Sequence, residues 1–254
     1  MGIPTDVAKV RGARYYDQLS TFGFIAALTR QIRLLTHIVV LPYHHPLEVA
    51  KRFGTLDRLS SGRLILGLGV GSLKQEFELL GASFDDRGAR YDDAISALRA
   101  SLGKRTPAYQ GTFYRFESFI IDPCAVQDPV PLWLGGRTPK SLRRAVAVAD
   151  GWVPITQIHP VRFGLSLEEL SALVNEAREW PEWKARSRPF EIALGLEEPL
   201  DLEAPAQVEA ARKQVDRMRA AGATVINVTL KASSAAHYVA QLESFKDKVI
   251  SQFA

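Results

Sequence analysis

Apolar runs of strand length alternate along the chain with stretches in which apolar residues recur every three or four positions. The strand-like runs are Thr36–Leu41, Arg63–Gly67, Pro131–Leu134, Gly151–Ile155, Phe190–Gly195 and Thr224–Leu230. The helical pattern covers Ala13–Arg30, Pro46–Leu59, Leu73–Leu80, Asp86–Leu102, Pro139–Ala149, Leu165–Glu179, Ala206–Ala221 and Ser234–Ile250. One further segment, Thr112–Ile121, alternates between apolar and polar residues and predicts a hairpin or an excursion.

The alternation of strands and helices predicts an α/β fold with parallel strands, because parallel neighbours need a crossover between them. The strands are nearly uninterrupted apolar runs, as expected when helices cover both faces of the sheet. No linker or low-complexity segment divides the chain, so we expect a single domain over residues 1–254. The pattern predicts about six main strands, whereas a closed (β/α)₈ barrel needs about eight.

Composition narrows the classes of function. The 254 residues are 46% hydrophobic and 24% charged, which is ordinary for a globular protein. The formal charge is +4, but charges of both signs are interspersed, so an anionic small ligand fits equally well and no nucleic-acid partner is expected. The single cysteine, Cys124, excludes an internal disulfide and suits a reducing cytosol. No apolar run approaches the roughly 18 residues of a membrane span, so we expect a cytoplasmic protein without a membrane partner.

A glycine-rich turn follows the second strand-like run, in the stretch Gly62-Arg-Leu-Ile-Leu-Gly-Leu-Gly-Val-Gly71-Ser72. Glycine lets the backbone approach a ligand closely, and the helix that follows offers free N–H groups to an anion. The run reads GxGxG, so the dinucleotide fingerprint GxGxxG is not met. On this pattern alone, a ligand site and a tight connection from strand to helix are equally good interpretations.

A second glycine turn lies in Leu132-Trp-Leu-Gly-Gly-Arg-Thr-Pro-Lys-Ser141. Thr138 is a natural N-cap, and Pro139 suits the first helical position. Together with Arg137, the free N–H groups of this helix would form a phosphate cradle. A well-capped helix without a ligand is the alternative. We favour the anion site because this is a second glycine turn at the same end of the sheet.

Histidines mark the first strand-like run and its exit. His37 lies inside the run, and His44 and His45 follow its carboxyl end, where parallel α/β folds place their sites. Adjacent histidines point in different directions, and no HxH or HxxxH with a nearby carboxylate occurs, so we expect no metal site. The chain also lacks the GxSxG motif of serine hydrolases.

Two long stretches together resemble the luciferase-like monooxygenase superfamily. They are LTHIVVLPYHHPLEVAKRFGTLDRLSSGRLILGLGVGSLKQEFELLGASFDDRGARYDD and PLWLGGRTPKSLRRAVAVADGWVP. The resemblance extends from about Tyr15 to the end of the chain and is closest to the oxidoreductases that depend on coenzyme F420. It implies a TIM-type barrel that binds a flavin or a deazaflavin at the carboxyl ends of its strands.

The resemblance also implies which residues bind the cofactor. The strand that contains His37 would carry a bulge with a non-proline cis peptide bond, His37–Ile38, behind the deazaflavin ring. His44 and His45 would lie at the rim, against cofactor or substrate. The implied cofactor-binding set is His37, Ile38, Gly69, Gly71, Ser72, Gly135, Gly136, Arg137 and Thr138.

The chain departs from the family pattern in two places. Family members usually carry another β-α-β segment before the helix that begins near Ala13, so we expect a TIM-type barrel that lacks the first two of eight strands. The sugar-phosphate dehydrogenases of the family carry a glutamate where this chain has Ser72, so the resemblance assigns no catalytic residue. Unpaired sheet edges are then expected at Thr36–Leu41 and Thr224–Leu230. Because exposed edges favour pairing, we expect a shortened barrel that is open at the missing positions, or sealed by Met1–Val10 or by a second subunit, and we expect a homodimer.

Three functions remain open on the sequence. The first is an F420-dependent oxidoreductase that moves a hydride between the deazaflavin and a small organic substrate, and the basic charge favours the anionic tail of F420. The second is an FMN-dependent monooxygenase that activates oxygen. The third is a degenerate, non-catalytic barrel that only binds the cofactor. A Rossmann-type NAD protein is the poorest match, because a helical stretch follows GLGVG where a second strand would be needed.

Overall fold

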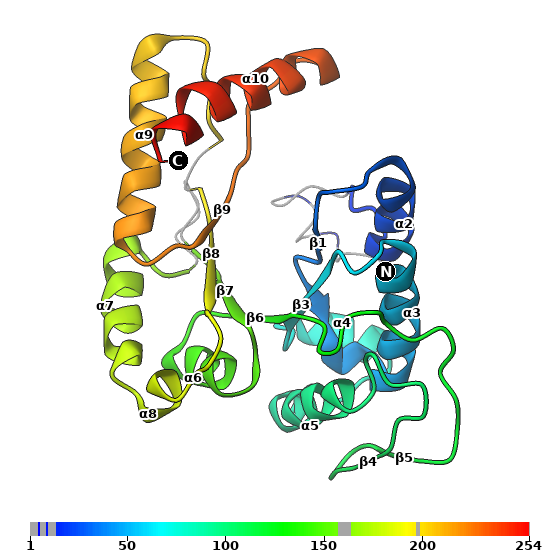
Figure 1. Ribbon diagram of the computed structural model, residues 1–254. Helices are drawn as coiled ribbons and strands as arrows, with labels where there is room; N and C mark the ends of the chain where they lie inside the picture. Colours follow the sequence, from blue (N-terminus) through cyan, green and yellow to red (C-terminus); the bar gives the residue numbers. More distant parts are fainter. Residues whose placement is uncertain (1–4, 6–8, 10–13, 157–163, 197–198, 254) are drawn as a thin grey trace. The chain divides into compact units, whose positions relative to one another are not determined.

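The computed structural model describes residues 5, 9, 14–156, 164–196 and 199–253. The chain divides into two compact units, residues 1–133 and 134–254, and strands alternate with helices in both (Figure 1). The prediction of an α/β fold with parallel strands is confirmed. The expectation of a single domain over residues 1–254 stays a prediction.

The first unit is built around β3, a strand whose six residues are all buried. Both β1 and β2 pair with β3 in parallel, while β4 and β5 form an antiparallel hairpin. The elements are α2 (Gln18–Leu28), β1 (Leu34–Leu35), β2 (Val39–Val40), the 3₁₀ helix η1 (Leu41–Tyr43), α3 (Pro46–Leu59), β3 (Leu64–Gly69), α4 (Lys74–Leu79), α5 (Arg87–Arg99), β4 (Tyr109–Gln110) and β5 (Arg115–Phe116).

The strand predicted as one run over Thr36–Leu41 is interrupted, which corrects the prediction. Leu35 lies opposite Ile65 and Val39 lies opposite Leu68, so three residues of one strand face two of the other. Such a bulge was implied by the family resemblance and is confirmed. The side chain of Thr36 takes over the pairing there, because its Oγ1 accepts from the Gly67 N–H at 2.7 Å and donates to the Gly67 carbonyl at 2.9 Å.

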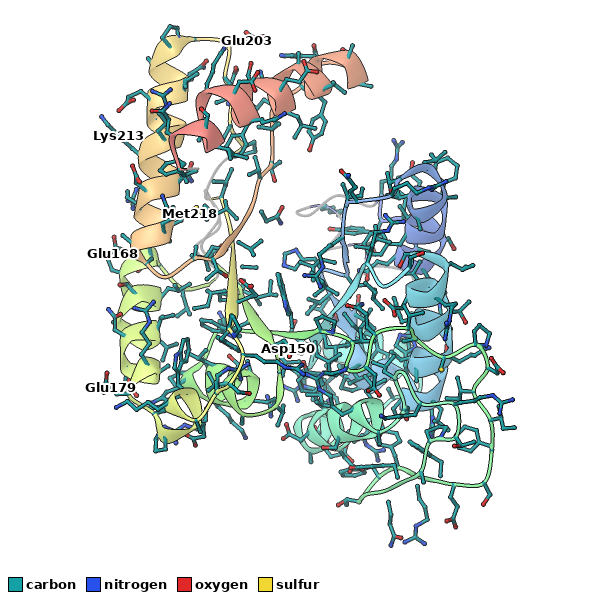
Figure 2. All side chains as sticks on the ribbon, viewed as in Figure 1. Asp150, Glu168, Glu179, Glu203, Lys213 and Met218 are labelled. Carbon is teal, nitrogen blue, oxygen red and sulfur yellow. The ribbon has the colours of Figure 1, made fainter. Side chains whose placement is uncertain are left out.

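The second unit continues from β6, whose first two residues belong to the first unit. Strands β7, β8 and β9 pair in parallel, and β6 lies beside β7. The elements are β6 (Leu132–Gly136), α6 (Pro139–Val148), β7 (Gly151–Pro154), α7 (Leu167–Arg178), α8 (Pro181–Lys184), β8 (Glu191–Gly195), α9 (Pro205–Ala220), β9 (Val225–Asn227), α10 (Ala235–Lys248) and η2 (Ile250–Gln252). Figure 2 shows Lys213 and Met218 on α9; Met218 is buried, whereas the Lys213 side chain is 74% exposed.

Side-chain caps fix where several helices begin. The His45 ring accepts from the backbone of α3, and Thr138 and Ser166 form reciprocal capping boxes at the starts of α6 and α7. These caps satisfy backbone N–H groups that lack partners in the first helical turn. Helix α3 begins at Pro46, directly after the His45 cap, and matches the predicted span Pro46–Leu59 residue for residue.

Two buried charges hold the ends of α3 and β3 in the first unit. The Asp57 carboxylate accepts from the backbone N–H groups of Val126 and Gln127 at 2.9 and 3.0 Å and from the Gln127 side chain at 2.7 Å. Arg63, 9% exposed, donates to carbonyl groups at the C-terminal end of α2 and to the Ser60 carbonyl. Both charges are therefore satisfied by neutral groups of the chain itself, and they fix the strand that leads to the first glycine turn.

Candidate functional site

The first glycine turn is filled by side chains of its own unit. A Cβ atom on Gly69 would lie 2.0 Å from Cδ1 of Ile38, and one on Gly71 would lie 2.7 Å from both Val40 Cγ1 and Phe77 Cε2. Gly71 also has φ +80°, a conformation that favours glycine. The two glycines are thus required by packing within the protein. Their predicted contact with a cofactor stays a prediction.

The bulge next to this turn carries two of the predicted site residues. The His37–Ile38 bond is cis, as predicted. Gln18 Nε2 donates to the Ile38 carbonyl at 3.4 Å, so the start of α2 contacts the bulge. His37 reaches the surface, but partial burial of its ring lowers its pKa and keeps the imidazole neutral near pH 7. The structure therefore brings Ile38 and Gly69 into direct contact and places His37 beside them in the chain.

His44 and His45 occupy the exit of the same strand, and each has a structural partner. His45 Nδ1 accepts from the Leu47 N–H at 3.2 Å as the N-cap of α3, and its ring lies edge-on against Tyr114. His44 Nδ1 lies 3.7 Å from a Glu48 carboxylate oxygen. Burial is the main cause that lowers the pKa of both histidines. Their predicted place at a substrate rim stays a prediction, although His45 now has a role in helix capping as well.

A hydrogen-bonded pair that the sequence analysis did not identify lies at this edge of the first unit. Tyr43, at the end of η1, donates its hydroxyl to Glu76 Oε2 at 2.7 Å, and Glu76 lies in the first turn of α4. The two residues are separated by 33 positions, so no local spacing could reveal the contact. Both follow the carboxyl ends of adjacent parallel strands, β2 and β3, where sites of α/β folds are found.

The second glycine turn is polar where the first is apolar. Gly136 has φ +150°, and a Cβ atom there would lie 2.3 Å from Ser141 Cβ. In the capping box, the Thr138 N–H donates to Ser141 Oγ at 3.0 Å, and the Ser141 N–H donates to Thr138 Oγ1 at 3.2 Å. The cap therefore already uses two N–H groups that had been predicted to receive a phosphate. Arg137 and the exposed Lys140 are the cationic groups of the turn.

The charges around the start of α6 fit an anion. Residues 137–149 contain Arg137, Lys140, Arg143 and Arg144 and no acidic residue. Cations near a helix N-terminus oppose the helix dipole, whereas an anion there is stabilised by it. Arg143 is partly engaged, since its guanidinium lies 4.5 Å from the centre of the Trp180 ring. This donor set matches the phosphate or carboxylate groups of a nucleotide-like cofactor.

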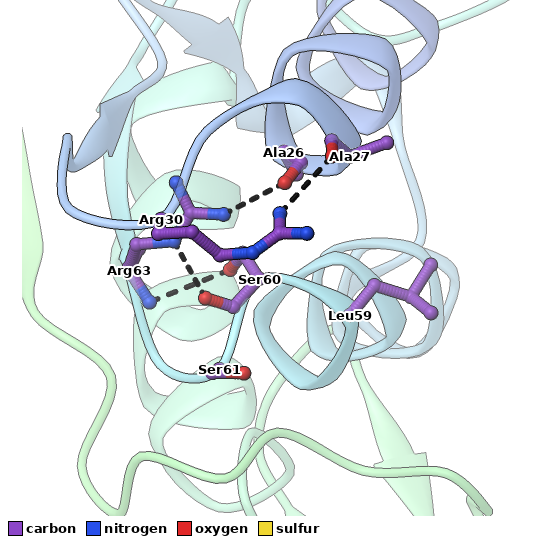
Figure 3. Close-up of a pocket in the computed structure, with 7 residues that line it drawn as sticks. All are labelled: Ala26, Ala27, Arg30, Leu59, Ser60, Ser61 and Arg63. Carbon is purple, nitrogen blue, oxygen red and sulfur yellow. Dashed lines mark hydrogen bonds between the residues drawn. The ribbon is translucent and has the colours of Figure 1, made fainter.

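A cavity of about 330 Å³ lies at the opposite, amino-terminal end of β3 (Figure 3). Figure 3 shows Arg30 and Arg63 turned toward the carbonyl groups of Ala27 and Ala26. These guanidinium groups cap the C-terminal end of α2, and the neighbouring Ser60 hydroxyl donates to the Asp57 carbonyl at 3.2 Å. The cavity is therefore part of the framework around α2 and α3 and adds no reactive group to the site.

Within the ranges described above, no group of three or more His, Cys, Asp or Glu residues is arranged to hold a metal ion. In the same part of the chain, no helix combines the length and the apolar character needed to cross a membrane.

Comparison with known proteins identifies relatives of this chain and of its fold. The family described as luciferase-like monooxygenase matches residues 5–196. An uncharacterized protein of Mycobacterium tuberculosis is 32% identical over 177 residues, which are 68% of this chain and 58% of that protein. The chain spans about half the length of the curated relatives that it matches.

Two solved structures share the fold. The monooxygenase RslO1 from Streptomyces bottropensis superposes with a TM-score of 0.80 and 21% identity, over 95% of this chain and 87% of that one. A coenzyme F420-dependent tetrahydromethanopterin reductase from Methanopyrus kandleri superposes with a TM-score of 0.74 and 16% identity, over 94% of this chain and 88% of that one. These matches confirm the predicted TIM-barrel-like fold.

Proposed function

The chain belongs to the luciferase-like monooxygenase family, and on that premise we propose that it is an oxidoreductase that uses coenzyme F420. In this proposal a hydride moves between the deazaflavin and a small organic substrate. The family comprises flavin- and F420-dependent oxidoreductases. The choice of F420 over FMN, the substrate and the activity of this chain belong to the proposal.

The cationic start of α6 is the observation that carries the proposal. Arg137 and Lys140 lie directly after the Gly135–Gly136 turn, in a segment without acidic residues. Both F420 and FMN contain a phosphate, and F420 adds a tail with several carboxylates. A donor set of this kind fits both cofactors and favours the more anionic one. A structural neighbour described as F420-dependent supports the same choice.

When bound, F420 supplies a carbon centre that accepts or donates a hydride, so the protein itself must bind, orient and exclude water. In the first unit, Ile38 and Gly69 would form an apolar support for the ring system, because the Ile38 side chain already covers Gly69. In the second unit, Arg137 and Thr138 would bind the phosphate. The half-buried His44 and the exposed His45 would contact the substrate or the cofactor at the rim.

A fluorescence-quenching titration with F420, with FMN titrated in parallel, tests the proposal. We expect micromolar or tighter binding of F420 and weaker binding of FMN. Tight FMN binding with weak F420 binding would place the protein with the oxygen-activating flavin monooxygenases instead. Binding of neither cofactor would favour a barrel that has lost its cofactor site.

A charge-removing variant locates the anion site. We expect Arg137→Gln to weaken F420 binding by about ten- to a hundredfold, as for loss of a hydrogen bond to a charged group. Lys213→Gln is the matched control, because Lys213 is an exposed cation on α9 of the same unit. Its Nζ lies 3.8 Å from Oε1 of Glu209. Equal affinities for F420 in the two variants would show that the anion site does not lie at the second glycine turn.

A further inference from the structure

We propose that Tyr43 is a catalytic residue of the hydride transfer, and that it passes a proton between the substrate oxygen and the carboxylate of Glu76. This inference rests on the proposed function. It adds a substrate class, namely alcohols and the corresponding carbonyl compounds, because those substrates must lose or gain a proton on oxygen as the hydride moves.

The position of the pair is the first support. The Tyr43 hydroxyl lies 2.7 Å from Glu76 Oε2, and each residue follows the carboxyl end of one of two neighbouring parallel strands. The pair also borders the first glycine turn, since Phe77, which follows Glu76, fills the space at Gly71. Tyr43 and Glu76 therefore lie at the edge of the sheet that the proposed cofactor site occupies in this unit.

Aromatic packing holds the tyrosine in place. The Tyr43 ring meets the fully buried Phe77 edge-on, with ring centres 4.6 Å apart, and Phe77 meets Phe84 at 5.2 Å. The Arg87 guanidinium covers the Phe84 ring at 3.7 Å, and its Nε donates to the Gly71 carbonyl at 3.3 Å. The hydroxyl is thus fixed by a rigid stack that is continuous with the glycine turn, as proton transfer requires.

The direction of the hydrogen bond between Tyr43 and Glu76 determines which atoms can accept a further hydrogen bond. Tyr43 uses its proton toward Glu76, so the lone pairs of its oxygen are left to accept a hydrogen bond from a substrate hydroxyl. Both side chains are half-buried rather than enclosed. The nearby cation of α4, Lys74, lies 3.7 Å from Glu78 rather than from Glu76.

The ionisation of the tyrosine is consistent with this role. Burial, followed by the hydrogen bond to Glu76, raises the pKa of Tyr43 well above its ordinary value. The hydroxyl is protonated around neutral pH, so in the resting protein Tyr43 is the donor of its hydrogen bond to Glu76.

The chemical step balances in both directions. In oxidation, the carbinol C–H bond breaks and its hydride, with two electrons, goes to oxidised F420. The substrate O–H bond breaks at the same time, its proton goes to the Tyr43 oxygen, and the tyrosine proton goes to Glu76 Oε2. The substrate carbon and oxygen form a carbonyl group, and the Glu76 carboxyl group later releases its proton to solvent. Reduction of a carbonyl compound by reduced F420 runs the same transfers backwards.

Kinetics with simple probes test the relay. The wild-type protein and its variants are assayed with oxidised F420 and the probe alcohols 2-propanol and cyclohexanol. We expect Tyr43→Phe to lower kcat by about a hundredfold, within the usual range for general acid–base catalysis, while F420 affinity stays unchanged. Glu76→Gln should lower kcat in the same way. Glu78→Gln, which changes the carboxylate two residues further along α4, should leave kcat unchanged.

A second readout needs neither cofactor nor turnover. Tyrosine labelled with ¹³C at Cζ reports ionisation by NMR, and the Tyr43→Phe variant identifies the Tyr43 signal among the seven tyrosines. We expect Glu76→Gln to let Tyr43 ionise at a lower pH than in the wild type, and Glu78→Gln to leave its titration unchanged. If Tyr43 ionises at the same pH in Glu76→Gln as in the wild type, the proposed proton transfer between the two residues is contradicted.

The outcomes separate this inference from the proposed function. If F420 does not bind to the wild type, the proposed function fails. If F420 binds but no probe alcohol is oxidised, the relay is contradicted and the proposed use of F420 is kept. The same conclusion follows if Tyr43→Phe oxidises the probe alcohols as fast as the wild type does. In the latter case Tyr43 and Glu76 only brace η1 against α4, and Tyr43→Phe should lower thermal stability without changing kcat.

Discussion

The two glycine turns look alike in sequence and differ in structure. Each follows a buried strand and precedes a helix. In the first unit, Gly71 is required by the apolar side chains of Val40 and Phe77. In the second, Gly136 is required by Ser141, a member of a polar capping box. Glycine thus makes room for apolar side chains in the first turn and for a hydrogen-bonded capping box in the second.

Because of this difference, the two turns are suited to contact different kinds of chemical group. An apolar, tightly packed turn is suited to support a flat ring system, because its side chains cannot rearrange without cost. A capped turn flanked by Arg137 and Lys140 is suited to bind an anion. Substitutions in the first turn should therefore change stability most, whereas substitutions in the second should change ligand affinity most.

The largest effect is expected where a glycine of the first unit meets backbone. A Cβ atom on Gly67 would lie 1.9 Å from the Thr36 carbonyl oxygen, which cannot move without breaking the bulge. We expect Gly67→Ala to lower the free energy of unfolding by about 3 kcal/mol or more. Gly71→Ala should follow at about 2–3 kcal/mol, from its positive φ and the contact with Phe77. Urea denaturation measures both, and a cost near zero for Gly67→Ala would contradict the packing seen in the turn.

A rescue experiment sharpens the account of Gly69. The atom that a Cβ would meet there is Cδ1 of Ile38, the end of a flexible side chain. We expect Gly69→Ala to cost about 1–3 kcal/mol, and Ile38→Val, which removes Cδ1, to restore about half of that loss in the double variant. Additive losses in the double-mutant cycle would show that Ile38 is not what requires glycine at this position.

The sequence predicted the elements well and the contacts between them poorly. Periodicity and capping residues located α3 and α6 within a residue or two, because both signals are local. The bulge at Thr36 was implied only by the family resemblance. Its physical cause, a threonine hydroxyl that replaces backbone pairing with Gly67, depends on a strand 31 residues away. The short helix α8 was missed, since its four residues are too few to show a period.

The candidate site shows the same limit. The family resemblance implied that His45 lies at a substrate rim, and this stays a prediction. Its partners, the Leu47 N–H and the Tyr114 ring, also make it the N-cap of α3. The contact between Tyr43 and Glu76 joins segments that only the pairing of β2 and β3 brings together. Residue types at the ends of strands can be predicted from sequence, whereas the partners of their side chains follow from tertiary packing.

A smaller effect on stability is expected from the residues that precede α6 and α4. Thr138 caps α6, whereas Leu73 precedes α4 without a side-chain cap. We expect Thr138→Ala to lower the free energy of unfolding by about 1 kcal/mol and Leu73→Ser to raise it by up to about 1 kcal/mol. Thr138→Ser, which keeps the hydroxyl, is the control. Equal losses for the serine and alanine variants would mean that the hydroxyl does not cap α6.

The smallest effect is a pH dependence that belongs to the first turn. His37, His44 and His45 have pKa values lowered chiefly by burial from the ordinary 6.5, so the unfolded chain binds protons at a higher pH than the folded one. Their contribution to stability is therefore complete above about pH 6.5 and decreases as the pH falls through that value and below it. Urea denaturation between about pH 8 and about pH 5 should show a shallower loss of stability for His37→Gln than for the wild type, and an unchanged loss for Arg137→Gln. An identical pH dependence in His37→Gln and the wild type would show that the His37 ring is as well solvated in the folded chain as in the unfolded one.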